Sequence, residues 1–500
     1  MTLNVDVRGA RYALFLGALI AIILGSGAFA VREFAELAAG SPGGEYAVLP
    51  SAKAEPSYRE LPDGAVILSS QAAVAERKEA FIRGGDDFIF ADLEAMELTV
   101  FRGGEPAKTV PIRAKGREGS FFETPSGIYS VRSKETDHFS SIGKVWMPWS
   151  MHVFGNYFIH GWPYYPDGRP VPEGFSGGCI RLSTADAAGV FSLARPGMTV
   201  LVSAGGEKPA ADFAYFRKVS VAGDSFAASL GARSALAADL ETGKILFEKE
   251  RRATLPIASI TKLMTALVTL EAVNRYRLLT VSAQDLAAFG DAGLSAGETF
   301  ESQDLLYPLI LASSNDAASV YERSAWRLVE LMNEKARAIG LAETHFADAS
   351  GISPENVSST EDLFRLLRFL YRNKKPLFEI SGLFEKTLVS ASGREHRWTN
   401  VNWAAEDSRY LGGKTGKTRE AGETIAAAFS VKLAEFGERP VAVILLGSPD
   451  RARDAELTLT YLEENFVYGT TFTKDKANAP GIPSGAAIYE AVESWQELGE

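Results

Sequence analysis

The stretch 256–265, Pro-Ile-Ala-Ser-Ile-Thr-Lys-Leu-Met-Thr, begins a run of apolar residues at helical spacing that continues to Val273. Ser259 and Lys262 stand three residues apart at the start of this predicted helix, so both side chains project from one face and the amine can reach the hydroxyl. A neutral lysine can take the proton of the serine if burial and nearby cations lower its pKa. The stretch therefore predicts a helix that presents a nucleophilic serine beside its base.

Two further motifs follow this helix along the chain. Ser313-Ser314-Asn315 comes after a second predicted helix at 302–312, and Lys414-Thr415-Gly416 opens a strand-like run after two glycines. A Ser-x-x-Lys spacing alone often arises by chance. Three motifs in this order and at this spacing indicate a serine active site.

Residues 230–470 resemble the serine D-Ala-D-Ala carboxypeptidases, the low-molecular-weight penicillin-binding proteins. The resemblance implies that Ser259 is the nucleophile and Lys262 its base. It gives the proton relay and substrate clamp to Ser313, Asn315 and Lys414, and the oxyanion hole to the backbone N–H groups of Ser259 and Lys417. The substrate-binding residues that it implies are Thr415, which would bind the terminal carboxylate, Gly416, Lys417 and a late arginine, with Arg453 as the candidate and Arg451 as the alternative.

A second possible nucleophile is Cys179, the only cysteine of the chain, in the run Ser-Gly-Gly-Cys-Ile-Arg-Leu at 176–182. A thiol attacks an acyl carbon well only as a thiolate, so it needs a base within reach and donors for the oxyanion. His160 stands at the end of an apolar strand-like run, Phe158-Ile159-His160-Gly161-Trp162. A histidine in such a place is more often structural. The nearby cysteine motif makes His160 the candidate base.

Residues 87–203 resemble an L,D-transpeptidase catalytic domain of the YkuD type, in which a His-Gly strand end and a Ser-His-Gly-Cys-(Ile/Val)-Arg-Leu loop frame the nucleophile. The run Phe-Glu-Thr-Pro-Ser-Gly-Ile-Tyr at 122–129 fits the strand start of that family. The resemblance implies Cys179 as nucleophile, His160 as base and the Gly161 backbone as the group that orients the imidazole. Backbone N–H groups near Gly178 and Cys179 would be the oxyanion donors, and Arg181 would hold the loop or contact a substrate carboxylate. Gly177 replaces the loop histidine of the family, whose auxiliary role has no counterpart here.

The two regions also differ in their pattern of elements. Residues 87–203 alternate in short stretches broken by Gly and Pro, which predicts a mostly-β domain with one helix at 183–194 and a hairpin turn at 102–105. Residues 230–470 predict an α/β sheet with flanking helices and an inserted helical cluster. The expected strands are 235–239, 245–248, 424–431 and 440–446, and the expected helices are 259–273, 302–312, 316–339 and 360–372.

These observations predict a multi-domain chain. Its expected parts are a cytoplasmic N-terminus with a membrane anchor or signal segment at 1–34, a linker and lead-in at 35–86, the L,D-transpeptidase domain at 87–203, a connection at 204–229, the carboxypeptidase domain at 230–470 and a tail at 471–500.

The N-terminal segment is expected to export the catalytic part. Residues 12–31 form a charge-free run of about the ~20 residues needed to cross a bilayer, with Arg8 and Arg11 just before it. This charge bias places the N-terminus in the cytoplasm and the rest of the chain outside. A cleavable signal peptide ending near Ala28-Phe29-Ala30 is the alternative, and the length of the run favours an anchor in the inner membrane.

Composition excludes other classes of function. Of 500 residues, 46% are apolar and 23% charged, which is typical of globular proteins, and the length indicates two domains. The net charge of −11 argues against a general nucleic-acid binder, because phosphate contacts need a basic surface. No metal and no cofactor are expected, since the histidines lack ligand spacing and the cysteine is single.

Together, the resemblances imply a bifunctional enzyme of the bacterial cell wall. A carboxypeptidase removes the terminal D-Ala from a pentapeptide stem, and the resulting tetrapeptide is the acyl donor that L,D-transpeptidases use for cross-links. Peptidoglycan stem peptides are the expected substrates, and β-lactams are the expected covalent inhibitors. One alternative is a serine domain that acts as a β-lactamase or endopeptidase. Another is that one domain is a non-catalytic envelope-binding module.

Overall fold

The computed structural model describes residues 58–61, 66–67, 70–204, 213–218, 225–287, 292–433 and 437–470. All of them belong to one compact unit, Ser57–Glu500. The predicted membrane segment at 12–31 and the predicted tail at 471–500 lie outside the described residues. Within the described ranges, no helix combines the length and the apolar character needed to cross a bilayer.

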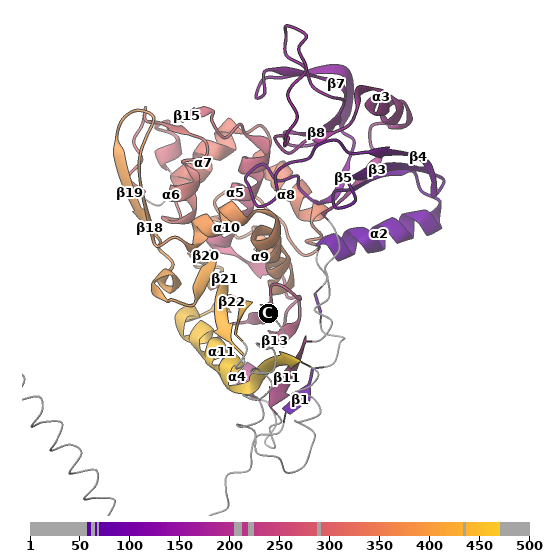
Figure 1. Ribbon diagram of the computed structural model, residues 1–500. Helices are drawn as coiled ribbons and strands as arrows, with labels where there is room; N and C mark the ends of the chain where they lie inside the picture. Colours follow the sequence, from indigo (N-terminus) through magenta and orange to yellow (C-terminus); the bar gives the residue numbers. More distant parts are fainter. Residues whose placement is uncertain are drawn as a thin grey trace, which may run out of the picture. The chain divides into compact units, whose positions relative to one another are not determined.

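The first domain is built on a five-stranded sheet with the order β4-β3-β2-β10-β5, in which β10 runs parallel to β2. The sequence-predicted turn at 102–105 joins β3 to β4, and both of its glycines have positive φ values. Figure 1 shows α2 (Ser70–Gly84) along one face of the sheet, where Val74 joins a small apolar core. A helix thus occupies part of the stretch that the sequence indicated as a lead-in. The strands are β2 (Phe88–Asp92), β3 (Glu97–Arg102), β4 (Glu105–Pro111), β5 (Gly127–Ser130) and β10 (Thr199–Ser203).

A second sheet in this domain, ordered β6-β7-β8-β9, carries the cysteine loop. Strand β8 ends at His160, and β9, parallel to it, begins directly after Cys179. The predicted helix at 183–194 is confirmed as α3 (Thr184–Leu193), and its cap Ser183 accepts a hydrogen bond from the Asp186 N–H. The strands are β6 (Ser133–Ser140), β7 (Val145–Phe154), β8 (Tyr157–His160) and β9 (Ile180–Arg181).

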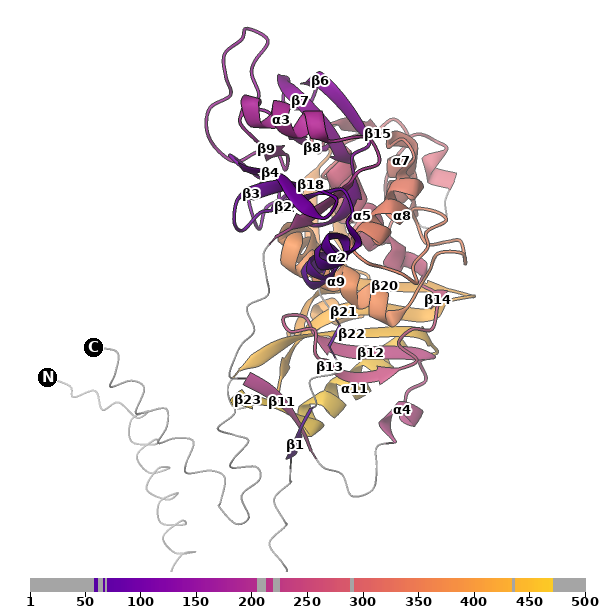
Figure 2. The ribbon, with the colours of Figure 1, turned by 90° about the vertical axis from the view of Figure 1, so that its right-hand side faces the viewer.

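The second domain has an antiparallel sheet with the order β13-β12-β22-β21-β20. Both faces of the sheet are covered, which explains its long apolar strands. Figure 2 shows α9 (Thr360–Asn373) above the strands and α11 (Arg451–Asn465) below them, and alternate residues of β12 join two different apolar cores. The four strands that the sequence predicts here are confirmed. The strands are β12 (Ser234–Asp239), β13 (Ile245–Lys249), β20 (Tyr410–Thr418), β21 (Gly422–Lys432) and β22 (Glu438–Ser448).

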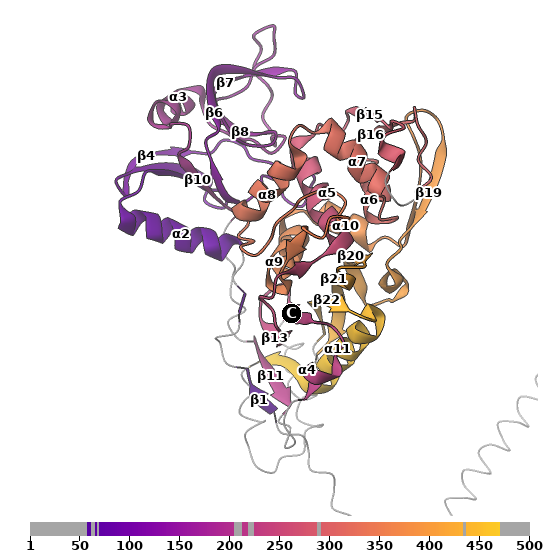
Figure 3. The same ribbon diagram turned by 180° about the vertical axis from the view of Figure 1, so that it is seen from behind.

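A cluster of helices stands on the α9 side of this sheet (Figure 3). The predicted helix at 259–273 is confirmed as α5. The prediction of one continuous helix at 316–339 is wrong, because Ala325 is extended and Arg327 is left-handed, with a φ of 57°, which interrupts the ladder of helical hydrogen bonds. The predicted helix at 302–312 is shortened to α6. The members are η1 (Ala258–Ile260), α5 (Thr261–Ala272), α6 (Leu306–Ile310), α7 (Asn315–Ser324), α8 (Leu328–Ala338) and α10 (Lys375–Gly382).

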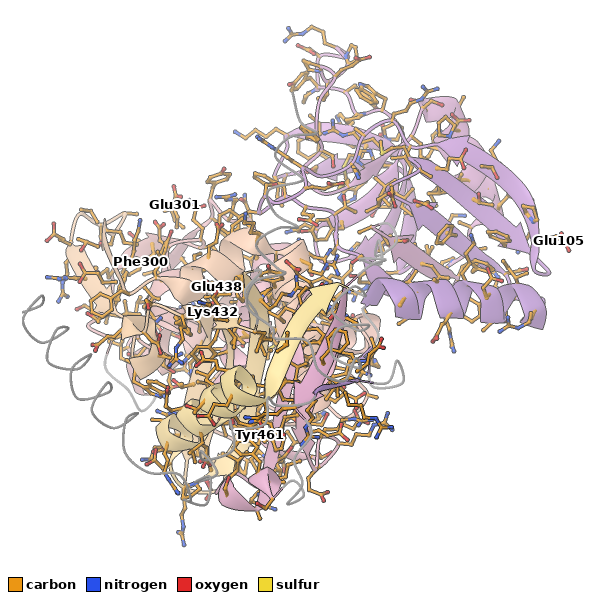
Figure 4. All side chains as sticks on the ribbon, turned by 60° about the horizontal axis from the view of Figure 1, so that its bottom comes forward. Glu105, Phe300, Glu301, Lys432, Glu438 and Tyr461 are labelled. Carbon is orange, nitrogen blue, oxygen red and sulfur yellow. The ribbon has the colours of Figure 1, made fainter. Side chains whose placement is uncertain are left out.

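Short elements complete the described part. The third sheet, β1-β11-β23, includes β11 from the predicted connection at 204–229. Figure 4 labels Tyr461 of α11, which stacks on Phe226 of α4 with ring centres 4.0 Å apart, and it labels Lys432 and Glu438, which pair at the ends of β21 and β22. The remaining elements are β1 (Tyr58–Glu60), β11 (Phe213–Lys218), α4 (Phe226–Ser229), β14 (Leu255–Pro256), β15 (Leu278–Thr280), η2 (Asp285–Ala287), β16 (Thr299–Glu301), β17 (Val357–Ser358), β18 (Glu385–Val389), β19 (Glu395–Thr399), η3 (Trp403–Glu406) and β23 (Phe466–Thr470).

Candidate active sites

The serine is the middle residue of η1, which leads directly into α5. Ala258, just before it, has a left-handed φ of 50°, and Gly351 packs so closely that a Cβ there would come within 2.0 Å of the Ala258 carbonyl oxygen. From β20, a Cβ on Gly416 would lie 2.8 Å from the backbone nitrogen of Ser259. Glycine at 416 therefore lets the edge of β20 approach the serine backbone.

Lys262 is buried one helical turn after the serine. Its Nζ lies 2.9 Å from Ser259 Oγ, 2.8 Å from Asn315 Oδ1 and 2.6 Å from the carbonyl oxygen of Ser350. Burial lowers the pKa of Lys262 to about 7, and the charge of Asp348 opposes that shift. A large share of the amine is therefore uncharged near neutral pH, so it can accept the serine proton.

The other predicted motifs reach the same place from two further elements. Ser313, left-handed with a φ of 55°, stands in the turn before α7, and Asn315 begins that helix after the Ser314 cap. Lys414 is buried on β20, and its Nζ donates to the Thr415 carbonyl oxygen at 2.9 Å. Burial lowers the pKa of Lys414 well below its usual value, and the charges of Lys262 and Arg451 lower it further. The structure thus brings the Ser-x-x-Lys helix, α7 and β20 together.

The structure distinguishes the two candidate arginines. Arg451 begins α11, and its Nη1 donates to the Gly416 carbonyl oxygen at 2.9 Å. Arg453 has an exposed side chain, and its backbone nitrogen bonds the helix cap Asp450. The side chain of Lys417 is also directed outward, where it pairs with Glu423 at 2.8 Å. Of the two candidates, Arg451 is therefore the arginine that contacts β20.

The cysteine site is framed by the parallel pair β8 and β9. His160, the last residue of β8, is in register with Arg181 of β9, and Cys179 directly precedes β9. The Cys179 Sγ lies 3.6 Å from the Asn156 carbonyl oxygen. Among the described residues, no hydrogen bond joins His160 to Cys179. Such bonds often tighten only when substrate binds.

His160 is held as a neutral base. Its Nδ1 lies 2.6 Å from the Gly161 carbonyl oxygen, so Nδ1 carries the proton and Nε2 is left to accept one. Burial lowers the pKa of His160 to about 4, although the Gly161 carbonyl favours the charged form. The imidazole is therefore uncharged at neutral pH, with its single proton on Nδ1.

Hydrogen bonds from two side chains shape the loop before the cysteine. Ser176 Oγ donates to the Cys179 carbonyl oxygen and accepts from the Gly178 N–H. Thr124 Oγ1 donates to the Gly178 carbonyl oxygen at 2.9 Å. Gly178 has a φ of 109°, and a Cβ there would lie 2.0 Å from the Tyr157 ring. Gly177 has open space around it, so the family histidine is missing from a position that could hold it.

Burial also raises the pKa of the Cys179 thiol, while the Phe158 backbone N–H and the Arg181 charge act in the opposite direction. The resting pair is thus a neutral thiol and a neutral imidazole, and proton transfer must accompany attack on the substrate. The Arg181 guanidinium lies 5.7 Å from the Trp162 ring centre.

Several contributors to these sites carried no usable sequence signal. Ser350 acts through its backbone carbonyl, which any residue could supply. The group of Asn156 that lies next to Cys179 Sγ is also a backbone carbonyl, which any residue could supply. Thr124 is different, because it belongs to the strand start that carries the resemblance, and its hydroxyl could have been singled out there.

Comparisons with known proteins match both regions. The D-alanyl-D-alanine carboxypeptidase family model matches residues 221–448, and the L,D-transpeptidase catalytic domain model, YkuD, matches residues 86–202. A D-alanyl-D-alanine endopeptidase of Pseudomonas aeruginosa is 30% identical over 232 residues, which cover 43% of this chain and 71% of the relative. D-alanyl-D-alanine carboxypeptidase DacF of Bacillus subtilis is 28% identical over 239 residues, covering 45% of this chain and 60% of that protein. The crystal structure of a D-alanyl-D-alanine carboxypeptidase from Mycobacterium tuberculosis is 25% identical, covers 46% of this chain and 90% of its own, and has a TM-score of 0.42.

The lowered pKa of Lys262 predicts the pH dependence of penicillin acylation. Only the uncharged amine accepts the Ser259 proton, so the acylation rate should rise with pH and level off above an apparent pKa of about 7. Stopped-flow labelling with a fluorescent penicillin measures this profile. Lys432→Met, at an exposed position on β21, should reproduce it. A rate that is flat from about pH 6 to about pH 8 would contradict the role of Lys262 as the base.

Two adjacent glycines provide a test of the cysteine loop. Gly178→Ala should lower the free energy of unfolding by about 2 kcal/mol or more, because the methyl group meets the Tyr157 ring and the backbone is left-handed. Gly177→Ala should change it by less than about 0.5 kcal/mol, since that position is open. Chemical denaturation of the two variants measures the difference. Equal effects would show that the loop is not packed as described.

Proposed function

The chain belongs to the D-alanyl-D-alanine carboxypeptidase family and carries an L,D-transpeptidase catalytic domain, and on this basis we propose that its two active sites act in turn on one peptidoglycan stem peptide. The serine site removes the terminal D-Ala from pentapeptide stems. The cysteine site uses the resulting tetrapeptide as the acyl donor for L,D cross-links. The proposal is supported by the hydrogen bond between Ser259 and Lys262 in one half of the chain, and by His160 and Cys179 at the ends of the neighbouring strands β8 and β9 in the other.

In the serine half of the scheme, Ser259 Oγ attacks the carbonyl carbon of the D-Ala-D-Ala bond, and its proton passes to Lys262 Nζ, 2.9 Å away. The C–N bond breaks, and the departing D-Ala amine takes up that proton. Water then hydrolyses the acyl-serine. The backbone N–H groups of Ser259 and Lys417 are the proposed oxyanion donors. Arg451, beside Gly416, is the proposed partner of the terminal carboxylate, together with Thr415.

In the cysteine half, Cys179 Sγ attacks the carbonyl carbon of the third stem residue of a tetrapeptide, and His160 Nε2 takes the thiol proton. The bond to D-Ala breaks, D-Ala leaves with that proton, and an acyl-cysteine remains. An amine of a neighbouring stem peptide then attacks the acyl-cysteine, gives up a proton and releases the thiol. The backbone N–H of Cys179 is the proposed oxyanion donor, because the Gly178 N–H already donates to Ser176 Oγ. The product is an L,D cross-link.

A second activity for the serine site is supported by the names of its relatives. Proteins of Pseudomonas aeruginosa and Escherichia coli that match this region are named D-alanyl-D-alanine endopeptidases, at 30% and 26% identity. Such a site would hydrolyse a D,D cross-link between two stems with the same Ser259 and Lys262. Purified enzyme given either a pentapeptide monomer or a D,D-linked dimer separates the two activities by mass spectrometry of the products.

We also propose where the enzyme acts. Peptidoglycan stems lie outside the cytoplasm, so the catalytic domains must be extracytoplasmic. The charge-free run at 12–31, preceded by Arg8 and Arg11, is the proposed anchor in the inner membrane. β-Lactams are the proposed covalent inhibitors of Ser259.

Inactivating each nucleophile in turn should separate the two reactions. Cys179→Ala should abolish L,D cross-links and leave D-Ala release from pentapeptide intact. Ser259→Ala should abolish penicillin labelling and D-Ala release, yet still cross-link supplied tetrapeptide. Mass spectrometry of muropeptides detects both products. Persistent cross-linking by the first variant, or persistent labelling of the second, would overturn the corresponding nucleophile.

The sequential scheme predicts an advantage for having both sites in one chain. Wild-type enzyme given pentapeptide should form L,D cross-links faster than an equimolar mixture of Cys179→Ala and Ser259→Ala, because the mixture must pass tetrapeptide between molecules. The difference should grow at low enzyme concentration and disappear when tetrapeptide is supplied. Equal rates would remove the benefit of tethering while keeping both activities. Cross-linking of pure pentapeptide by Ser259→Ala would overturn the sequence of reactions.

A further inference from the structure

A buried ionic cluster lies at the end of the helix that begins with the serine site. Glu271, near the end of α5, has no exposed side-chain surface. Its carboxylate lies 2.9 Å from Lys335 Nζ of α8 and 3.5 Å from Lys374 Nζ at the end of α9, and both lysine side chains are equally buried. We call these three residues the Glu271 cluster. Each lysine ammonium has three N–H donors, and the single carboxylate of Glu271 cannot accept hydrogen bonds from all of them. Because the lysines are buried, their remaining N–H groups need other acceptors.

Those donors are satisfied by residues of the L,D-transpeptidase domain. Lys374 Nζ donates to the Glu123 carbonyl oxygen at 2.8 Å and lies 3.5 Å from the Tyr157 hydroxyl. Lys335 Nζ donates to the Tyr129 hydroxyl at 2.9 Å. The serine domain therefore supplies buried charge to strands and loops that belong to the cysteine domain.

The backbone of Glu271 makes a further contact with the same domain. Its carbonyl oxygen accepts a hydrogen bond from the Asn156 N–H at 3.0 Å. The approach is close enough that a Cβ on Gly155 would come within 2.5 Å of that oxygen. The β7–β8 turn is thus seated on the end of α5.

Three of the contacted residues, Glu123, Asn156 and Tyr157, lie beside or supply a group that shapes the cysteine loop. Glu123 precedes Thr124, whose hydroxyl bonds the Gly178 carbonyl. The Tyr157 ring covers the Cα of Gly178, and the Asn156 carbonyl oxygen meets Cys179 Sγ. The paths from the Glu271 cluster to Cys179 that start at Asn156, Tyr157 and Glu123 therefore pass through one, two and three residues, respectively.

We propose that Lys374 and Glu271, although part of the serine domain, are positioning residues of the cysteine site: they hold residues 123–124 and 156–157 in place, and these in turn hold Gly178 and Cys179. The proposal rests on the proposed role of Cys179. It gives the fusion of the two domains a structural purpose in addition to product transfer. Residues of the serine domain thus support the backbone around the cysteine site.

The test uses the full chain and replaces Lys374 with an uncharged side chain of similar length. Lys374→Met should lower the kcat of L,D cross-linking from tetrapeptide about tenfold with KM within about twofold, because the nucleophile is displaced and the substrate surface is retained. In Lys374→Met, the apparent pKa for alkylation of Cys179 by iodoacetamide should also shift, because the polar contacts around the sulfur change. Cys179 is the only cysteine, so alkylation reports on it alone. Penicillin labelling of Ser259 should stay within about twofold of wild type.

Two further variants make the result decisive. Lys375→Met alters the next residue, whose side chain is 64% exposed, and should leave cross-linking, alkylation and labelling unchanged. Tyr157→Phe removes only the hydroxyl next to Lys374 and keeps the ring on Gly178, so it should give a smaller loss of kcat and an alkylation shift in the same direction.

Unchanged kcat and alkylation in both Lys374→Met and Tyr157→Phe would overturn the proposal. Loss of penicillin labelling in proportion to cross-linking in both variants would also overturn it, because the cluster would then support general folding. The alkylation result does not depend on the assigned reaction. If Cys179→Ala still forms cross-links, the proposed function fails, while alkylation still decides whether the cluster positions the cysteine.

Discussion

A carboxylate with no exposed surface needs cations beside it, and Glu271 has Lys335 and Lys374 within 3.5 Å. This cluster constrains the rest of the molecule, because it lies at one end of α5 while Ser259 and Lys262 lie at the other. Removing one partner of such a cluster typically costs about 3–5 kcal/mol. The helix is therefore fixed at both ends, by buried charge at one and by the catalytic hydrogen bonds at the other.

Desolvation prepares both active sites, but it acts on different groups. At the serine site, burial lowers the pKa of Lys262 to about 7, so the base is available near neutral pH. At the cysteine site, burial lowers the pKa of His160 to about 4 and raises that of the Cys179 thiol. The serine site thus uses a lysine that would be charged in water. At the cysteine site, burial favours the uncharged forms of both Cys179 and His160.

The second feature that the two sites share is a glycine at which another part of the chain packs closely against the backbone. Gly416 lets β20 reach the backbone of Ser259, and Gly178 lets Tyr157 cover the cysteine loop. In both places a methyl group would displace the backbone that carries the nucleophile. The two sites have unrelated folds around them, yet each depends on a glycine that brings a neighbouring element into contact.

The sequence by itself determined the parts whose information is local. The Ser-x-x-Lys helix, the Ser183 cap and the hairpin turn at 102–105 follow from spacing, capping and turn chemistry, and they are confirmed. Both sets of candidate nucleophiles and bases also follow from short motifs. Only the tertiary structure shows that Arg451 contacts β20 whereas the Arg453 side chain is exposed, because this difference depends on a strand far away in the chain. It also interrupted the helix predicted at 316–339, and it brought Glu271 of α5 and Lys335 of α8 together as a buried ion pair. These features depend on contacts between residues far apart in the chain, and a local sequence pattern does not predict such contacts.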